Sequence, residues 1–467
     1  MWVLLNDGFA AVAGAASCRF RLSANLSWRT MIESLHLRNV GPAPEMEMTL
    51  APRLNLITGD NGLGKSFLLD VIWWALTRKW PQEVNPHMNA GYAARPGVAG
   101  EDATIGFRAR GRSTTAEYEA RYVPRDQAWV GPAGRPLLPG LVIYAHTDGS
   151  FSFWDPARNY WRRRGDADVS ERRPAQVFTQ DEVWNGAYVQ ENGRRVPICN
   201  GLIIDWAAWI SAKNDSHAAM KAVIEALASD GTGVRVEPGS LSRISIDDPR
   251  DIPTVRTGYA EAIPILHASA GIRRVVALAY MLTLAWREHR LAAEQLGEQP
   301  CDSVVLLIDE VESHLHPRWQ RSILRSLTGA MRELGTPEAV QMVVTTHSPL
   351  VLASVEAWFD EGRDGWFDLD LEHESGVKLR RGVYERRGAV GHWLTSDAFD
   401  LLTDRGSIEA ERVVLRAREL LSGEESSLEK VDEVGRELGK VLSVSDPFLA
   451  RWGHFRELLR EKRTTEQ

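Results

Sequence analysis

The order of apolar and polar positions along the chain predicts an α/β fold. Val304–Ile308 is an unbroken apolar run, typical of a strand buried on both faces of a parallel sheet. Leu54–Thr58 and Gln341–Thr345 predict two further strands. Apolar residues at helical spacing follow the first of these strands, and a second strong helix is predicted from Arg273 to Trp286.

The segment between these two helices has shorter elements. Residues 140–155 predict a β-hairpin that turns at Asp148-Gly149, whereas residues 201–212 and 216–230 have the apolar spacing of helices. Long heptads are absent, so the segment does not predict a coiled-coil arm. We expect a compact insertion, β-rich at first and helical afterwards. Beyond residue 357 the chain predicts a β-rich stretch at 366–388, then helices near 407–423, 429–444 and 447–463.

These patterns suggest an order of parts. We expect the core to be split between residues 31–130 and 261–357, with the inserted lobe at 131–260 and a β-hairpin and helical C-terminal region at 358–467. The first strand is predicted to begin at Met31. Residues 1–30 are then expected to be a disordered extension or the product of too early a start codon.

Composition fits a globular protein of two or three domains. The 467 residues are 44% hydrophobic and 25% charged, with a net charge of −8. This charge argues against a surface coated in positive charge, although a local basic groove remains possible. Cys18, Cys199 and Cys301 are too widely spaced for a disulfide framework, and the apolar runs are too short to span a bilayer. We therefore expect a cytoplasmic protein with no membrane partner.

The turn after the first core strand carries a phosphate-binding pattern. Glycines let a backbone bend tightly and point its N–H groups at phosphates, and the following helix adds its positive end. Lys65 would reach the β and γ phosphates of ATP, and the Ser66 hydroxyl would bind Mg²⁺. The predicted ATP-binding residues here are Gly59, Asp60, Asn61, Gly62, Leu63, Gly64, Lys65 and Ser66.

Polar residues follow two of the predicted strands. Asp309 and Glu310 end the apolar run at 304–308, and His347 lies just beyond 341–345. Ligands of open α/β sheets bind at the carboxyl ends of the strands. Asp309 is placed to hold Mg²⁺, Glu310 to polarise the attacking water, and His347 to bond the γ-phosphate or that water.

Ser269 and Gly271 lie directly before the second strong helix. Small residues at a helix start leave backbone N–H groups free to meet an anion, which makes both residues candidates for ATP binding. The alternative interpretation is an ordinary serine cap of the helix.

In this order, the segments resemble the ATP-binding cassette (ABC) ATPase core. Gly59–Ser66 resembles its Walker A motif, Val304–Glu310 its Walker B motif with the catalytic glutamate, and His347 its switch histidine. Ser269–Gly271 resembles the signature loop, without the usual preceding leucine and following glutamine. Glu312–Pro317 stands at the D-loop, and its H-L-H-P form is similar to the overcoming-lysogenization-defect (OLD) and RecF-like branch.

The resemblance implies a mechanism and partners. Two copies would enclose two ATP molecules, with the Ser269 loop of each copy completing the P-loop site of the other. This implies a homodimer or a higher homo-oligomer. Stand-alone ATPases of this form resemble the ATPase subunits of anti-phage systems such as Septu and PARIS, in which a separately encoded effector acts. A RecF-like repair ATPase is the first alternative, and a transporter nucleotide-binding subunit is the second.

Other residues leave further alternatives. The family's Q-loop glutamine has two candidates, Gln180 and Gln127. His314 and His316 form a less favoured metal pair. Asp368 and Asp370 would be the metal-binding pair if the chain were a nuclease, although the remaining chain leaves little room for a nuclease domain. Nucleic acid is a possible partner, because residues 161–165 and 379–388 mix arginine with aromatic residues.

Overall fold

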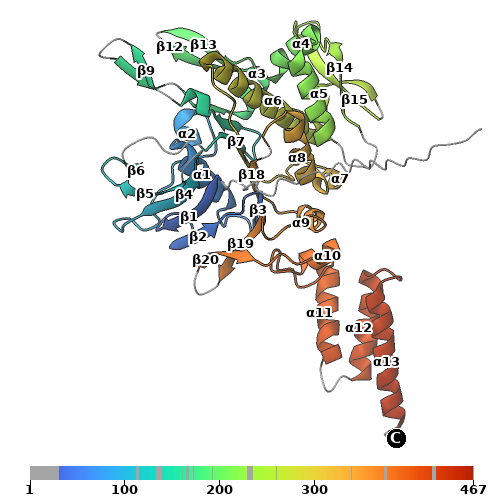
Figure 1. Ribbon diagram of the computed structural model, residues 1–467. Coiled ribbons are helices and arrows are strands. Elements are labelled where there is room, and N and C mark those ends of the chain that lie inside the picture. Colours follow the sequence, from blue (N-terminus) through green and yellow to red (C-terminus); the bar gives the residue numbers. More distant parts are fainter. Residues whose placement is uncertain are drawn as a thin grey trace, which may run out of the picture.

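The protein has a large α/β body and a separate helical bundle at its C-terminal end, as the computed structural model shows (Figure 1). The structure describes residues 31–465 apart from gaps at 112–114, 133–138, 160, 165–167, 172, 192, 229–234, 259, 338, 373–375 and 423–426. The expectation for residues 1–30 lies outside the described residues.

An eight-stranded sheet forms the centre of the body, in the order β11-β8-β7-β17-β18-β3-β19-β20. Strands β7, β17, β18, β3 and β19 are parallel, so their carboxyl ends meet at one edge. The bounds are β3 Leu54–Gly59, β7 Leu141–Ala145, β8 Phe151–Trp154, β11 Ala175–Phe178, β17 Val304–Ile308, β18 Val340–Thr345, β19 Asp364–Glu372 and β20 Gly376–Gly382. The strands predicted at 54–58, 304–308 and 341–345 are confirmed.

Alternate residues of the central strands enter two hydrophobic cores. Val304, Leu306 and Ile308 of β17 belong to one core, whereas Val305 and Leu307 belong to the other. Both faces of the sheet are therefore covered, which explains the unbroken apolar run.

A second, antiparallel sheet lies beside the first and has the order β2-β1-β4-β5-β6. The Gln341 amide on β18 joins the two parts, because it bonds the backbone of Met31, Ile32 and Ala51. The helix α1, Lys65–Thr77, shares the second core with this sheet. The bounds are β1 Ile32–Arg38, β2 Glu45–Thr49, β4 Thr104–Arg110, β5 Thr115–Val123 and β6 Ala128–Val130.

Helices and two of the small sheets, β12-β13 and β14-β15-β16, pack on the other core. The long α6, Ala270–Leu296, packs on α5 and begins and ends beyond the predicted span. The helices here are α3 Gln180–Asn185, α4 Leu202–Ala212, α5 Asp215–Leu227, α7 Pro317–Gln320, α8 Ile323–Glu333 and α9 Pro349–Val355, with α2 Pro81–Val84 elsewhere in the body. The small sheets are β9 Trp161–Arg164 with β10 Asp168–Glu171, β12 Ala187–Glu191 with β13 Arg194–Cys199, and β14 Glu237–Ser242, β15 Ile252–Thr257 and β16 Ala260–Pro264.

The central sheet crosses two of the expected boundaries. Strands β7, β8 and β11 come from the range 131–260, and β19 and β20 come from beyond 357. The hairpin at Asp148-Gly149 is confirmed, but its first strand also pairs with β17. The run Leu141–Ala145 is fully buried, as expected for a central strand. What is inserted between core elements is therefore smaller than the range 131–260.

The C-terminal helices have their own hydrophobic core. Helices α11, α12 and α13 pack around Trp452 and neighbouring aliphatic residues, and Figure 1 shows them standing away from the sheet. They confirm the three predicted C-terminal helices. Their bounds are α11 Ile408–Ser422, α12 Leu428–Val441 and α13 Pro447–Thr465, with α10 Val390–Leu394 between the sheet and the bundle.

Candidate nucleotide site

The glycine-rich turn joins β3 directly to α1. Gly64 is the N-cap of α1 and has φ +104°, a backbone conformation that residues other than glycine rarely adopt. Lys65 as a residue is only 5% exposed, and its ammonium donates hydrogen bonds of 2.7 Å to the carbonyl oxygens of Gly59 and Asp60. Burial lowers the pKa of Lys65. The nearby carboxylates of Glu310 and Asp309 raise that pKa again, so the ammonium lies in a charged site where it can also meet a phosphate.

A buried carboxylate lies across from this turn. Asp309 follows β17, and its Oδ1 accepts a 2.7 Å hydrogen bond from the Thr345 hydroxyl. Burial raises the pKa of Asp309, while hydrogen bonds from Thr345 and Ser66 lower it again. The Ser66 hydroxyl and the Asp309 carboxylate are oxygen donors of the kind that Mg²⁺ prefers, so they fit a magnesium ion that also binds phosphates.

Glu310 and His347 face each other beside Asp309. His347 Nε2 lies 3.9 Å from Glu310 Oε1. The Glu310 backbone has φ +45°, and its N–H donates to the Thr345 hydroxyl at 2.7 Å. Burial and then the nearby Lys65 lower the pKa of His347, which favours a neutral imidazole. The structure thus brings Lys65, Asp309, Glu310 and His347 to one edge of the sheet, as predicted.

Ser269 and Gly271 form the start of α6. Ser269 is exposed and caps the helix, with its hydroxyl oxygen accepting the Ile272 N–H at 3.4 Å. Gly271 is buried, and a Cβ there would come 2.9 Å from the His314 carbonyl oxygen and 3.3 Å from the Trp319 ring. The helix start therefore packs closely on the turn that follows Glu310, while Ser269 stays open to contacts from outside.

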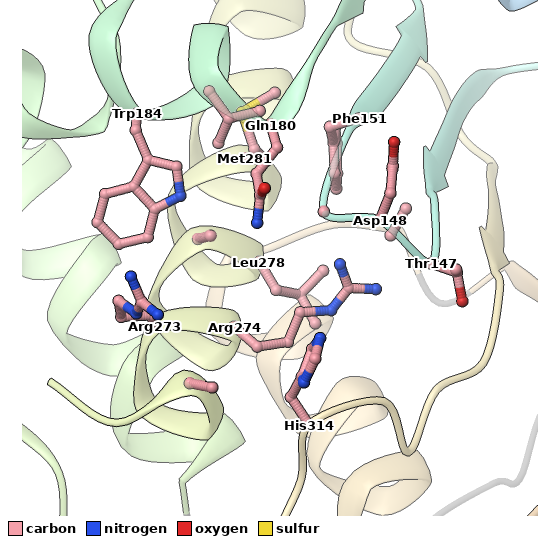
Figure 2. Close-up of a pocket in the computed structure, with 15 residues that line it drawn as sticks. Thr147, Asp148, Phe151, Gln180, Trp184, Arg273, Arg274, Leu278, Met281 and His314 are labelled. Atoms are coloured by element: carbon pink, nitrogen blue, oxygen red, sulfur yellow. The ribbon is translucent and has the colours of Figure 1, made fainter. Parts of the chain in front are cut away.

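A cavity of about 280 Å³ lies between the β7–β8 turn and the first turns of α6. Figure 2 shows Gln180, Arg274 and His314 approaching it from three separate elements. The Arg274 guanidinium donates to the His146 carbonyl at 2.8 Å, and burial lowers its pKa. Of the two Q-loop candidates, Gln180 lines this cavity, whereas Gln127 is exposed in the turn between β5 and β6.

Sequence reasoning missed several residues of the site. Thr345 bonds both Asp309 and Glu310, and Glu312 bonds the segment that carries His347. Asp70 accepts a 3.0 Å hydrogen bond from the Tyr144 hydroxyl, and burial raises its pKa to about 7. A signal for Asp70 was available, because it is a lone carboxylate inside the apolar run after Ser66.

The alternative metal sites find little support in the side-chain positions. His316 Nδ1 accepts the Arg318 N–H, and His314 is exposed. Asp368 accepts a 2.5 Å hydrogen bond from Thr58, and Asp370 faces Arg380 at 3.8 Å. Within the described residues, no group of three or more His, Cys, Asp or Glu side chains is arranged to hold a metal ion.

The two expected basic clusters differ in what the structure describes. Side chains at 161–165 lie outside the described part of the chain. In the second cluster, Arg380 pairs with Asp370 and Glu372, and the Arg387 guanidinium lies over the Trp393 ring, 5.4 Å from its centroid. These two arginines are already engaged within the chain.

The glycine-rich turn, the strand-end carboxylates and the histidine together have the arrangement of a nucleotide-binding P-loop site. Comparison with known families agrees with nucleotide binding. Residues 34–121 match the family described as "AAA domain", and residues 200–353 match "AAA domain, putative AbiEii toxin, Type IV TA system". The chain therefore carries AAA-family ATPase domains.

Similar proteins include two bacterial retron ATPases and a Septu protein. The chain is 25% identical over 40% of its length to a "Retron Ec83 probable ATPase" of Escherichia coli, and 41% identical over 11% to a "Retron Vc95 probable ATPase" of Vibrio cholerae. It is 29% identical over 25% to "Septu protein PtuA" of Bacillus mycoides. The matches span 31%, 9% and 15% of these relatives, so well under two thirds of their length is covered.

Solved structures of similar chains include an SMC head domain from Thermotoga maritima and a nucleotide-bound RecF recombination mediator. The first has a TM-score of 0.36 at 13% identity, covering 76% of this chain and 100% of the other. The second has a TM-score of 0.36 at 12% identity, covering 76% of this chain and 99% of the other.

Among the helices that the structure describes, none is both long and apolar enough to cross a membrane.

Proposed function

We propose that the chain binds and hydrolyses ATP as an ABC-type switch, and that it is the ATPase component of a cytoplasmic anti-phage defence system. The observation that carries the ATPase part is the meeting of Lys65, Asp309, Glu310 and His347 at one sheet edge. The names of the similar retron and Septu proteins support the defence role.

Each side chain has a role in this proposal. The turn at residues 59–66 and the positive end of α1 hold the phosphates, with Lys65 neutralising their charge. Ser66 and Asp309 would hold Mg²⁺, which supplies charge neutralisation at the phosphates when bound. Glu310 takes a proton from the attacking water, and the neutral His347 imidazole orients that water or the γ-phosphate.

The switch requires a second copy of the chain. Ser269 is exposed at the start of α6, where its hydroxyl and the helix N-terminus are open to a phosphate bound by another copy. ATP then closes the pair, and hydrolysis releases it. A separately encoded effector would respond to this change, and nucleic acid is a possible trigger.

Phosphate release by the purified chain tests the ATPase part. The wild type should release phosphate, whereas Glu310→Gln should bind ATP yet release phosphate at least about 100-fold more slowly, because the amide takes no proton. Lys65→Ala should lose ATP binding itself. Glu333→Gln, an exposed change on α8, is the matched control and should behave as the wild type. Wild-type turnover in Glu310→Gln would remove Glu310 from its proposed role.

A further inference from the structure

A partly buried carboxylate connects the two segments that carry Glu310 and His347. Glu312 lies two residues after Glu310. One of its oxygens accepts the backbone N–H of His347 at 2.5 Å, and the other accepts the Thr346 hydroxyl at 2.7 Å. The connection is continued by the Thr346 hydroxyl, which accepts the Ser348 N–H at 3.0 Å.

Other bonds hold the backbone on both sides of this connection. The Val311 N–H donates to the Thr345 carbonyl at 3.2 Å, and the Thr346 N–H donates to the Ile57 carbonyl at 3.0 Å. Glu312 adds a direct side-chain bond between the segment after Glu310 and His347 itself. Glu312 bonds the backbone of His347, so it sets the position of the whole residue and leaves the imidazole free. A charged acceptor makes such a bond roughly twice as strong as a neutral one.

The Glu312 carboxylate lies in surroundings that would be unfavourable without its two hydrogen bonds. Burial raises the pKa of Glu312, and the nearby Glu310 raises it further, whereas the bonds from His347 and Thr346 lower it. Burying a carboxylate beside a second carboxylate is costly unless its hydrogen bonds are satisfied.

We propose that Glu312 is a positioning residue that fixes His347 relative to Glu310 during ATP hydrolysis. The inference rests on the proposed ATPase function. It assigns to Glu312 no contact with ATP or with the attacking water. A displacement of about 1 Å in such a group is enough to reduce turnover about 100-fold.

A double-mutant cycle tests the assignment. Glu312→Ala should lower kcat about 10- to 100-fold and leave the Kd for ATP within about three-fold of the wild type. If Glu312 acts through His347, then Glu312→Ala should cause almost no further loss in a His347→Ala background. Glu312→Gln should retain at least about a third of kcat, because its amide oxygen still accepts the His347 N–H and its NH₂ still meets the Thr346 hydroxyl.

Three results would overturn the proposal. The first is a loss of kcat from Glu312→Ala that is equally large in the wild-type and His347→Ala backgrounds. The second is a Glu312→Gln variant with a kcat as low as that of Glu312→Ala, which would make the charge of Glu312 the cause. If Glu312→Ala does not fold, Thr346→Val, which removes the second bond, enters the cycle instead, and additive losses there would be the third. Absence of phosphate release by the wild type would refute the proposed function itself, and is thereby distinguished from these outcomes.

Discussion

The Thr345 hydroxyl donates a hydrogen bond of 2.7 Å to Asp309 Oδ1 and joins the ends of two neighbouring strands. The same oxygen accepts the backbone N–H of Glu310 at 2.7 Å. Asp309 and Glu310 are thus both held from β18, the strand that leads to His347. One hydroxyl couples the magnesium-binding and water-polarising residues of the proposed mechanism.

Thr345→Val should therefore weaken hydrolysis without removing the P-loop. Valine has nearly the same shape, but it leaves Asp309 and the Glu310 N–H without their shared partner. A buried polar group that loses its partner costs about 1–3 kcal/mol. We expect kcat to fall about 10- to 100-fold and the Mg²⁺ concentration for half-maximal turnover to rise.

Thr345→Ser is the matched control, because it restores the hydroxyl while removing a methyl group. Steady-state phosphate release across a Mg²⁺ titration measures both variants. Equal behaviour of the valine and serine variants would show that the hydroxyl has no part in the site.

The sequence predicted the strands of the site well but not these cross-strand bonds. The buried strands at 304–308 and 341–345 and the turn at 59–66 are local patterns, readable within a few residues. Thr345 meets Asp309 only because β17 and β18 pair in one register, and Tyr144 meets Asp70 across 74 positions of the chain. Such contacts depend on the sheet order, which the residue pattern alone does not determine.

The same reason explains the domain boundaries. The run Leu141–Ala145 was predicted as one arm of a hairpin, and it is that arm. Its other edge pairs with β17, a strand more than 150 residues later, and nothing local to the run indicates this partner. Asp148-Gly149 gives a strong turn signal, which describes only one side of the strand.

Gly271→Ala should destabilise the contact between α6 and the turn after Glu310. The added Cβ would lie 2.9 Å from the His314 carbonyl oxygen, a backbone atom that moves only with its segment. We expect a loss of about 1–3 kcal/mol in the free energy of unfolding, typical of overpacking, together with slower hydrolysis.

Gly329→Ala is its control, since a Cβ there meets only the Ala226 side chain at 4.0 Å. This helix-interior change should stabilise the chain by about 0.5–1 kcal/mol. Urea unfolding measures both variants. A neutral or stabilising Gly271→Ala would mean that the close packing at His314 is not maintained.

Asp70 should make stability depend on pH. Its pKa is raised from 3.8 to about 7 by burial, so the folded chain keeps a proton that the unfolded chain releases. This contribution is fully present below about pH 4 and is lost as the pH rises toward 7. Over that window the wild type should lose up to about 4 kcal/mol relative to Asp70→Asn, whose amide still accepts from Tyr144.

Urea unfolding at several pH values, without Mg²⁺ or nucleotide, measures this difference. Asp126→Asn, at an exposed turn position, should change with pH in parallel with the wild type. Parallel curves for Asp70→Asn and the wild type would contradict the assigned role of the buried Asp70 carboxyl.

The most direct test of the switch is ATP-dependent closure between two copies. Glu310→Gln should hold ATP without releasing phosphate, so it should accumulate the closed pair. Adding Ser269→Arg places a long side chain at the exposed start of α6, which should block closure and leave ATP binding by each P-loop unchanged. A distance probe across the two P-loops reports closure even if other contacts hold the copies together. We predict an ATP-dependent shortening in Glu310→Gln that is absent from the double variant, whereas closure that persists in the double variant would contradict the account.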